Sequence, residues 1–226
     1  MTESTTADLP RSVIASRFRE LRNRERNGPN IIVDRGMDEY ITHFMGLKSF
    51  FDYVHKLGSS KLVLDIGAGK TKAISQIEKS KLGKGLEFKA TVLAKDKEIV
   101  DKYLGSSRTI TTSAESLRGV NSESVAGILA MYSITYSYAP RLAIERMDQV
   151  LVPGGIIKAT FGSTSPEAKF TSPTEFINAW KDLGYDTFYW GDIALVIKPG
   201  ASGLPTAGKV FSDDWQYFDR KQQRLF

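Results

Sequence analysis

The stretch LVLDIGAGKTKAI, residues 62–74, combines residue types and spacings that suit a nucleotide or nucleoside ligand. An apolar run ends near Asp65, and Gly67 and Gly69 follow two residues apart. Glycines in a tight turn let the backbone approach a ligand closely, because no side chain occupies the space. The letters GKT at 69–71 also match the end of a phosphate-binding loop. Three ligands must therefore be compared: a nucleoside triphosphate, a dinucleotide and a nucleoside without phosphate.

The two phosphate-bearing ligands fit the spacing poorly. A triphosphate loop needs a glycine five residues before Gly69, where Leu64 stands, and the later apolar run 124–131 does not end in a magnesium-binding aspartate. A dinucleotide turn needs glycine at its sixth position, where Lys72 stands. The third ligand is S-adenosylmethionine, for which Asp65 would help to fix the turn and its ligand.

An alternation of strands and helices surrounds this turn. Helices are expected over 10–26 and 37–57. Strands are expected within 61–66, 86–94, 108–112, 124–131, 156–161, 185–190 and 193–198, and helices within 70–80, 96–104, 139–151 and 172–184. Only Gly191-Asp192 separates the last two strands, which forces a hairpin, whereas parallel strands need crossovers. The pattern predicts an α/β fold with a doubly wound, mostly parallel seven-stranded sheet and an antiparallel C-terminal hairpin.

Four motifs in this order resemble the class I S-adenosylmethionine-dependent methyltransferases: VLDIGAGKT, TTSAESL, GILAMYSITYS and VLVPGGIIKATF. The resemblance covers roughly residues 60–198. It implies a Rossmann-like methyltransferase domain over 59–198, an N-terminal helical lid over 1–58 and a C-terminal tail over 199–226. The tail either packs back or projects.

The resemblance implies contacts for each part of the cofactor. Residues Asp65, Gly67, Ala68 and Gly69 would line its methionine end, Ser113 and Ala114 its adenine, and Met131 and Tyr132 its sulfonium. The chain departs from the family at Ala94, where an acid usually binds both ribose hydroxyls. Asp96, beside Lys95, could reach back to take that role, and both are candidate cofactor contacts.

Methyl transfer asks the protein mainly to position the acceptor and to exclude water, with a general base only where the acceptor must lose a proton. His43 and Tyr132 are the candidate catalytic residues, and packing is the alternative role for each. Arg35 and Tyr40 belong to the same N-terminal stretch, where packing or surface exposure is the simpler expectation.

Two features that the sequence lacks limit the classes of methyl acceptor. The sequence has no cysteine, which excludes pyrimidine methylation through a thiol adduct. The Asp/Asn-Pro-Pro-Tyr/Phe signature of amino methylation on nucleobases does not follow the strand at 124–131. We expect transfer to an oxygen or nitrogen of a small-molecule acceptor.

Two other functions stay open. The chain could keep the fold as a binding or regulatory module without activity, as the departure at Ala94 suggests. It could also methylate RNA, because residues 11–26 hold six arginines and two glutamates within a chain of net charge +5. The composition is typical of a cytoplasmic protein, and we expect no membrane span and no metal site.

Overall fold

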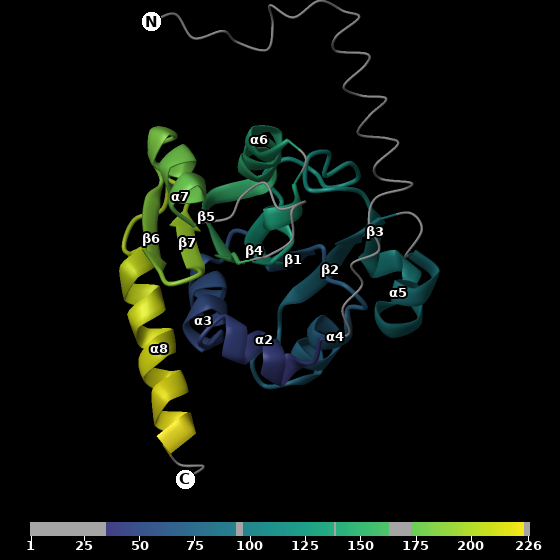
Figure 1. Cartoon of the computed structure of the whole chain (residues 1–226), viewed down its shortest axis with the longest axis horizontal. Coiled ribbons are helices and arrows are strands. Elements are labelled where there is room, and N and C mark those ends of the chain that lie inside the picture. The colour runs from purple at the N-terminus through teal and green to yellow at the C-terminus, as the bar shows by residue number, and fades with distance from the viewer. Residues whose placement is uncertain (1–34, 94–96, 138, 163–172, 224–226) are drawn as a thin grey trace, which may run out of the picture.

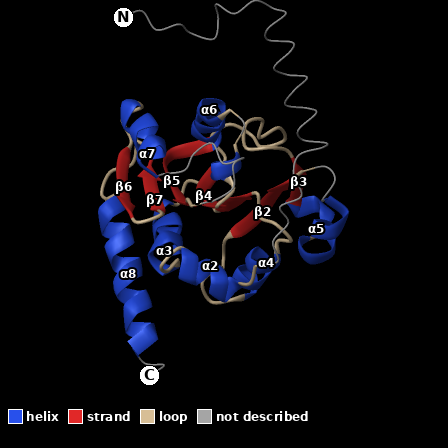
Figure 2. Cartoon of the chain, viewed as in Figure 1, coloured by secondary structure: helices blue, strands red, loops and turns tan. Residues whose placement is uncertain are grey.

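The computed structural model describes residues 35–93, 97–137, 139–162 and 173–223. A seven-stranded sheet crosses the middle of the molecule with helices on both sides (Figures 1 and 2). Its strands are β1 (Leu62–Ile66), β2 (Glu87–Val92), β3 (Thr109–Thr111), β4 (Val125–Met131), β5 (Leu151–Thr160), β6 (Asp186–Trp190) and β7 (Ile193–Ile197). Their spatial order is β3-β2-β1-β4-β5-β7-β6. The doubly wound sheet predicted from the sequence is confirmed.

The strand order reverses between β1 and β4. β1 pairs in parallel with β2 on one side and with β4 on the other. Every residue of β1, β4 and β7 is buried, as continuous apolar runs in a sheet covered on both faces require. Ligands of open α/β sheets bind at the carboxyl ends of strands where the order reverses. The fold therefore predicts a ligand site at the carboxyl ends of β1 and β4.

The C-terminal hairpin forms as predicted. β6 and β7 pair antiparallel across the two-residue turn at Gly191 and Asp192. β7 inserts between β5 and β6 and also runs antiparallel to β5. The hairpin brings Asp192 next to the end of β5, where Phe161 N donates to its carbonyl oxygen at 2.8 Å.

Helices cover both faces of the sheet. α2 (Met37–His43), α3 (Lys48–Leu57) and α4 (Lys72–Lys79) lie below the sheet in Figure 1, and α6 (Pro140–Val150) and α7 (Pro173–Asp182) lie above it. α5 (Lys97–Leu104) lies beside β3, at the opposite edge of the sheet from α8 (Ala207–Gln223). Apolar side chains form one buried cluster on each face.

Three sequence-based boundaries are corrected. The helix expected over 37–57 is two helices, because Met45 and Gly46 take positive φ angles of 51° and 102° and break it. The helix expected over 139–151 ends at Val150, and β5 begins at Leu151. β5 therefore starts five residues before the strand expected over 156–161, and it includes Pro153. The predicted helix over 10–26 lies outside the described residues.

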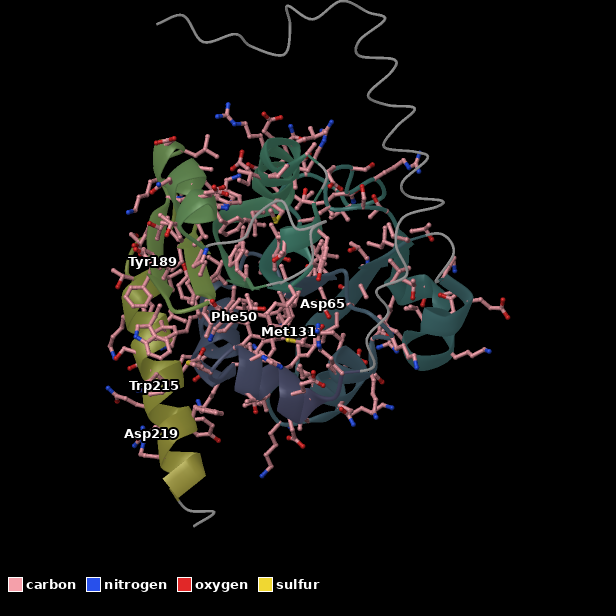
Figure 3. The ribbon with its side chains drawn as sticks, viewed as in Figure 1. Phe50, Asp65, Met131, Tyr189, Trp215 and Asp219 are labelled. Carbon is pink, nitrogen blue, oxygen red and sulfur yellow. The ribbon has the colours of Figure 1, made fainter. Side chains whose placement is uncertain are left out.

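The C-terminal stretch folds back as α8. Its first half contributes Ala207, Val210 and Phe211 to the apolar cluster below the sheet. The helix runs along β6 and α3, and its end lies beyond the edge of the sheet (Figure 1). Trp215 and Tyr189, from α8 and β6, lie at this edge and are partly exposed (Figure 3). No helix in the described ranges is long and apolar enough to cross a membrane.

Candidate active site

The glycine turn, residues 67–71, joins β1 to α4. Gly67, Gly69 and Thr71 have φ angles of 67°, 56° and 60°, so left-handed residues alternate along it. Glycine adopts this conformation without strain, which explains its use at two of the three positions. Gly67 N donates to the hydroxyl of Thr91 on β2 at 3.1 Å, and Thr71 N donates to the carbonyl of Ala68 at 2.9 Å. The turn is thus fixed by its own backbone and by the neighbouring strand.

Asp65, the second-last residue of β1, carries a buried carboxyl group, and its exposed fraction is only 1%. Tyr40 on α2 donates its hydroxyl to Asp65 Oδ2 at 2.8 Å. Asp65 Oδ1 is also buried, and it finds no hydrogen-bond partner among the described residues. Burial raises the pKa of Asp65 to about 8, against the lowering effects of the Tyr40 hydrogen bond and of Arg35. An unpaired oxygen on such a group is a place for a ligand with a donor or a positive charge.

Ser133, two residues beyond β4, lies directly against the glycine turn. A Cβ atom on Gly67 would lie 2.6 Å from the Cβ of Ser133, closer than two such atoms can come. The Ser133 hydroxyl is buried, with no partner within the described part of the chain. The sequence alone predicts that the missing side chain of Gly67 leaves space for a ligand. In this structure the absence of a side chain at Gly67 also allows the glycine turn and the turn at Ser133 to approach each other.

Tyr132 and His43, the two candidate catalytic residues, are joined by a hydrogen bond. Tyr132 Oη lies 2.8 Å from His43 Nδ1, and the rings meet edge to face with their centroids 5.3 Å apart. Tyr132 has φ of 56°, a strained conformation for a residue with a side chain. Its backbone N–H donates to both the carbonyl and the hydroxyl oxygen of Thr160 at the end of β5, each at 3.1 Å. These hydrogen bonds to β5 thus stabilise the strained backbone of Tyr132.

Charged side chains surround this pair. The guanidinium carbon of Arg35 lies 5.0 Å from the centroid of the Tyr132 ring, within cation–π range. Arg35 Nε donates to Glu39 Oε1 at 3.1 Å, and the same oxygen lies 3.7 Å from His43 Nε2. Burial raises the pKa of Tyr132, as do Asp192 and Glu39, whereas Arg35 lowers it.

The Glu39 carboxylate favours a proton on His43 Nε2, the ring nitrogen that faces it. Nδ1 is then the acceptor for the hydroxyl of Tyr132. We assign this tautomer from the surrounding charges.

The predicted adenine segment follows β3. Ser113 and Ala114 stand in the turn after Thr112, and Ala114 packs against the apolar cluster above the sheet. Glu115, buried beside them, accepts a hydrogen bond from the Ser137 hydroxyl at 2.8 Å. The segment is therefore tied to the loop that follows β4, the loop that also carries Tyr132.

The predicted residues fall into three groups. Asp65, near the end of β1, and Met131, the last residue of β4, both lie in the middle of the molecule (Figure 3). Gly67, Ala68 and Gly69 belong to the glycine turn that follows β1. His43 and Tyr132 form the hydrogen-bonded pair, and Ser113 and Ala114 stand on the linked loop. Lys95 and Asp96, like the departure at Ala94, lie outside the described residues.

The sequence does not predict three contacts of the site. Packing or surface exposure is the simpler expectation for Tyr40, although Tyr40 and His43 stand three residues apart and therefore share one face of α2. Ser133 could have been suspected only because it is the neighbour of Tyr132 in the sequence. Nothing in the sequence points to Thr160, because its contact with Tyr132 joins the end of β5 to the loop after β4. The described chain contains no cluster of acidic, histidine or cysteine side chains suited to a metal ion.

Comparisons with known proteins show which fold carries this site. No protein-family model matches the sequence. No curated protein matches it either. Solved structures do match, at low identity. The [4+2]-cyclase SpnF superposes with a TM-score of 0.52 at 15% identity, over 68% of this chain and 81% of that chain.

Two further structures are named as methyltransferases or their complexes. One is a chain from the complex of the Haloferax volcanii Trm112 methyltransferase activator with its assigned methyltransferase, with a TM-score of 0.52 and 14% identity, over 74% of this chain and 100% of that chain. The other is the CurJ carbon methyltransferase, with a TM-score of 0.50 and 14% identity, over 62% of this chain and 49% of that chain. The chain has the class I methyltransferase fold. This fold places the glycine turn and the loop after β4 at the sheet edge where such folds bind ligands.

Proposed function

We propose that the protein is an S-adenosylmethionine-dependent methyltransferase that acts on an oxygen or nitrogen of a small-molecule acceptor. The observation that carries this proposal is the Tyr132–His43 hydrogen bond of 2.8 Å beside the glycine turn. The fold alone does not decide the chemistry, since one similar structure is named a cyclase. The side chains of this chain therefore carry the proposal.

The residues around the glycine turn fit the amino-acid end of the cofactor. Asp65 Oδ1 is buried without a partner among the described residues, and the ionised carboxylate would suit the cofactor's ammonium group, whose positive charge favours that ionised form. The Ser133 hydroxyl, also buried and unpartnered there, is a second candidate contact for the same end of the cofactor. A bound cofactor would supply an electrophilic methyl carbon to the acceptor heteroatom, and its sulfur would keep the electron pair of the broken carbon–sulfur bond.

Tyr132 and His43 would remove the proton that the acceptor loses. The acceptor proton passes to Tyr132 Oη as the phenolic proton moves to His43 Nδ1, so the tyrosine stays neutral and the histidine becomes positively charged. A raised Tyr132 pKa disfavours a free phenolate, which makes the coupled transfer the better route. Glu39, 3.7 Å from His43 Nε2, would stabilise the resulting imidazolium.

Calorimetry tests the cofactor assignment. Titration with S-adenosylmethionine and with S-adenosylhomocysteine should give saturable heat for both. Asp65→Ala should abolish that heat. Asp148→Ala, a control in the last turn of α6, should keep it. Absence of heat from the wild type at high micromolar ligand would reject the assignment.

The acceptor is then sought by release of S-adenosylhomocysteine from a panel of small phenols, carboxylic acids and amines. Turnover of a panel member, lost in Tyr132→Phe, would support the proposed proton path.

A second candidate is a module that keeps the fold without binding the cofactor. The close packing of Ser133 on Gly67 favours it, because the two turns touch where the ligand would pass. The replacement Ser133→Gly removes that contact. Cofactor binding by the variant but not by the wild type would support this second candidate. The RNA hypothesis depends on residues 11–26, outside the described residues, and is tested by whether RNA affinity falls steeply with salt.

A further inference from the structure

A fully buried ion pair connects the C-terminal helix to the sheet. Lys158 on β5 and Asp214 on α8 have completely buried side chains, and Lys158 Nζ lies 2.7 Å from Asp214 Oδ2. Burial lowers the pKa of Lys158. Buried ion pairs are costly to desolvate and are a weak source of stability. A role in fixing geometry is therefore a reasonable explanation for this one.

The other hydrogen bonds of the pair go to the junction of α2 and α3. Lys158 Nζ donates to the carbonyl of Gly46 at 2.7 Å, and Asp214 Oδ1 accepts from Ser49 N at 2.6 Å. A Cβ on Gly46 would lie 2.7 Å from the Asp214 carbonyl oxygen, so α8 presses directly on the junction. Two side chains thus hold the end of α2, the start of α3 and α8 together.

This junction sits close to the candidate catalytic pair. His43 ends α2, three residues before Gly46. Thr160, two residues beyond Lys158 on β5, binds the backbone N–H of Tyr132. One strand therefore holds both partners: Lys158 fixes the helix that carries His43, and Thr160 fixes Tyr132.

We propose that Lys158 and Asp214 are positioning residues, which hold His43 against Tyr132 through the carbonyl of Gly46. The C-terminal helix then contributes to the geometry of the active site through the junction of α2 and α3. The proposal that this geometry serves catalysis rests on the proposed function. The positioning of His43 against Tyr132 by the ion pair does not depend on that function.

Nuclear magnetic resonance of the imidazole nitrogens tests the geometry directly. The sequence has two histidines, His43 and His55, so His55 serves as an internal control. In the wild type, His43 should show a single fixed tautomer with Nδ1 unprotonated. The variant Asp214→Asn weakens the attachment of Lys158, and Lys158→Met/Asp214→Asn removes it while an amide oxygen still accepts from Ser49.

The His43 nitrogen signals should move toward those of two averaged tautomers, slightly in Asp214→Asn and fully in the paired variant. The His55 signals should not move. Ile144→Ala, in the apolar cluster above the sheet, is the control for lowered stability. Unmoved His43 signals in the folded variants, or equal movement in Ile144→Ala, would overturn the proposal. If the paired variant does not fold, Asp214→Asn decides alone by the same criterion.

Calorimetry with S-adenosylmethionine separates the two proposals. The positioning variants should retain cofactor affinity within about twofold, because the glycine turn and Asp65 are unchanged. A wild type that gives no heat rejects the proposed function and leaves the resonance result to decide the positioning role. Where an acceptor is found, the variants should lower kcat with little change in KM.

Discussion

Tyr40 donates a hydrogen bond of 2.8 Å to Asp65, and so ties α2 to the end of β1. Tyr40 comes from the N-terminal stretch and Asp65 from the sheet, 25 positions later. Both groups are buried, and burial is the largest cause of the raised pKa of each. The glycine turn that follows β1 is therefore not independent of the helix that carries His43.

Replacement of Asp65 by asparagine should change how stability depends on pH. Between pH about 4 and about 8 the unfolded chain has Asp65 ionised, whereas the folded chain keeps it protonated. The folded state then binds more protons, so this group lowers the free energy of unfolding as pH rises, by at most about 1.4 kcal/mol per pH unit.

Urea denaturation at several pH values checks this in the wild type and in Asp65→Asn. The difference between the two proteins isolates Asp65 from other titrating groups. The wild type should lose stability relative to the variant as pH rises from 5 to 8. Parallel curves would show that Asp65 is ionised in the fold.

Replacement of Tyr40 by phenylalanine should destabilise the fold by about 1–3 kcal/mol, because it leaves a buried carboxyl oxygen without its donor. Equilibrium denaturation measures the loss. Tyr189→Phe is the matched control, since Tyr189 is 46% exposed on the edge strand β6 and its hydroxyl should contribute little. Equal effects of the two changes would contradict the role given to the Tyr40 hydroxyl.

Tyr132→Phe and His43→Gln should each lower methyl transfer by about 10²–10⁴-fold, since each removes one step of the proposed proton path. Cofactor affinity should stay within about twofold, because neither side chain is needed at the glycine turn. Initial rates and calorimetry on the same preparations measure both quantities. His55→Gln is the control and should keep full activity. A Tyr132→Phe enzyme with unchanged kcat would show that the acceptor loses its proton elsewhere.

Gly67→Ala should destabilise the protein by at least about 1–2 kcal/mol, because it forces a residue with Cβ into a left-handed conformation. The contact with Ser133 adds to this cost. In the double variant Gly67→Ala/Ser133→Gly, part of the loss should be recovered, with a coupling of about 0.5–3 kcal/mol. A double-mutant cycle by urea denaturation measures the coupling. Additive effects would mean that the two turns do not press on each other.

Lys158→Met alone should cost about 3–5 kcal/mol, because it leaves the Asp214 carboxylate buried without a cation. Addition of Asp214→Asn should recover most of that loss, since an amide carries no charge to desolvate. Thermal and urea unfolding of the two variants check the order. A paired variant no more stable than Lys158→Met would show that the ion pair contributes more than geometry.

The sequence was sufficient for the succession of strands and helices along the chain and for the glycine turn. Continuous apolar runs, helical periodicity and the two-residue connection at Gly191-Asp192 are local signals, and each predicts its element from neighbouring residues. The antiparallel pairing of the last two strands then follows, because a two-residue connection can only form a hairpin, whereas parallel strands need crossovers. The separation of α2 from α3 was missed, since the pattern of apolar residues continues through Met45 and Gly46.

Only the tertiary structure decided how the candidate site is assembled. The sequence placed His43 and Tyr132 on separate elements and gave no reason for them to touch. Their contact depends on Lys158 and Thr160 of β5 and on Asp214 of α8, which no local pattern links to either residue. Local sequence specifies backbone conformation, whereas contacts between distant residues arise from packing of the whole chain. The helix and the loop therefore meet only once the sheet has brought them together.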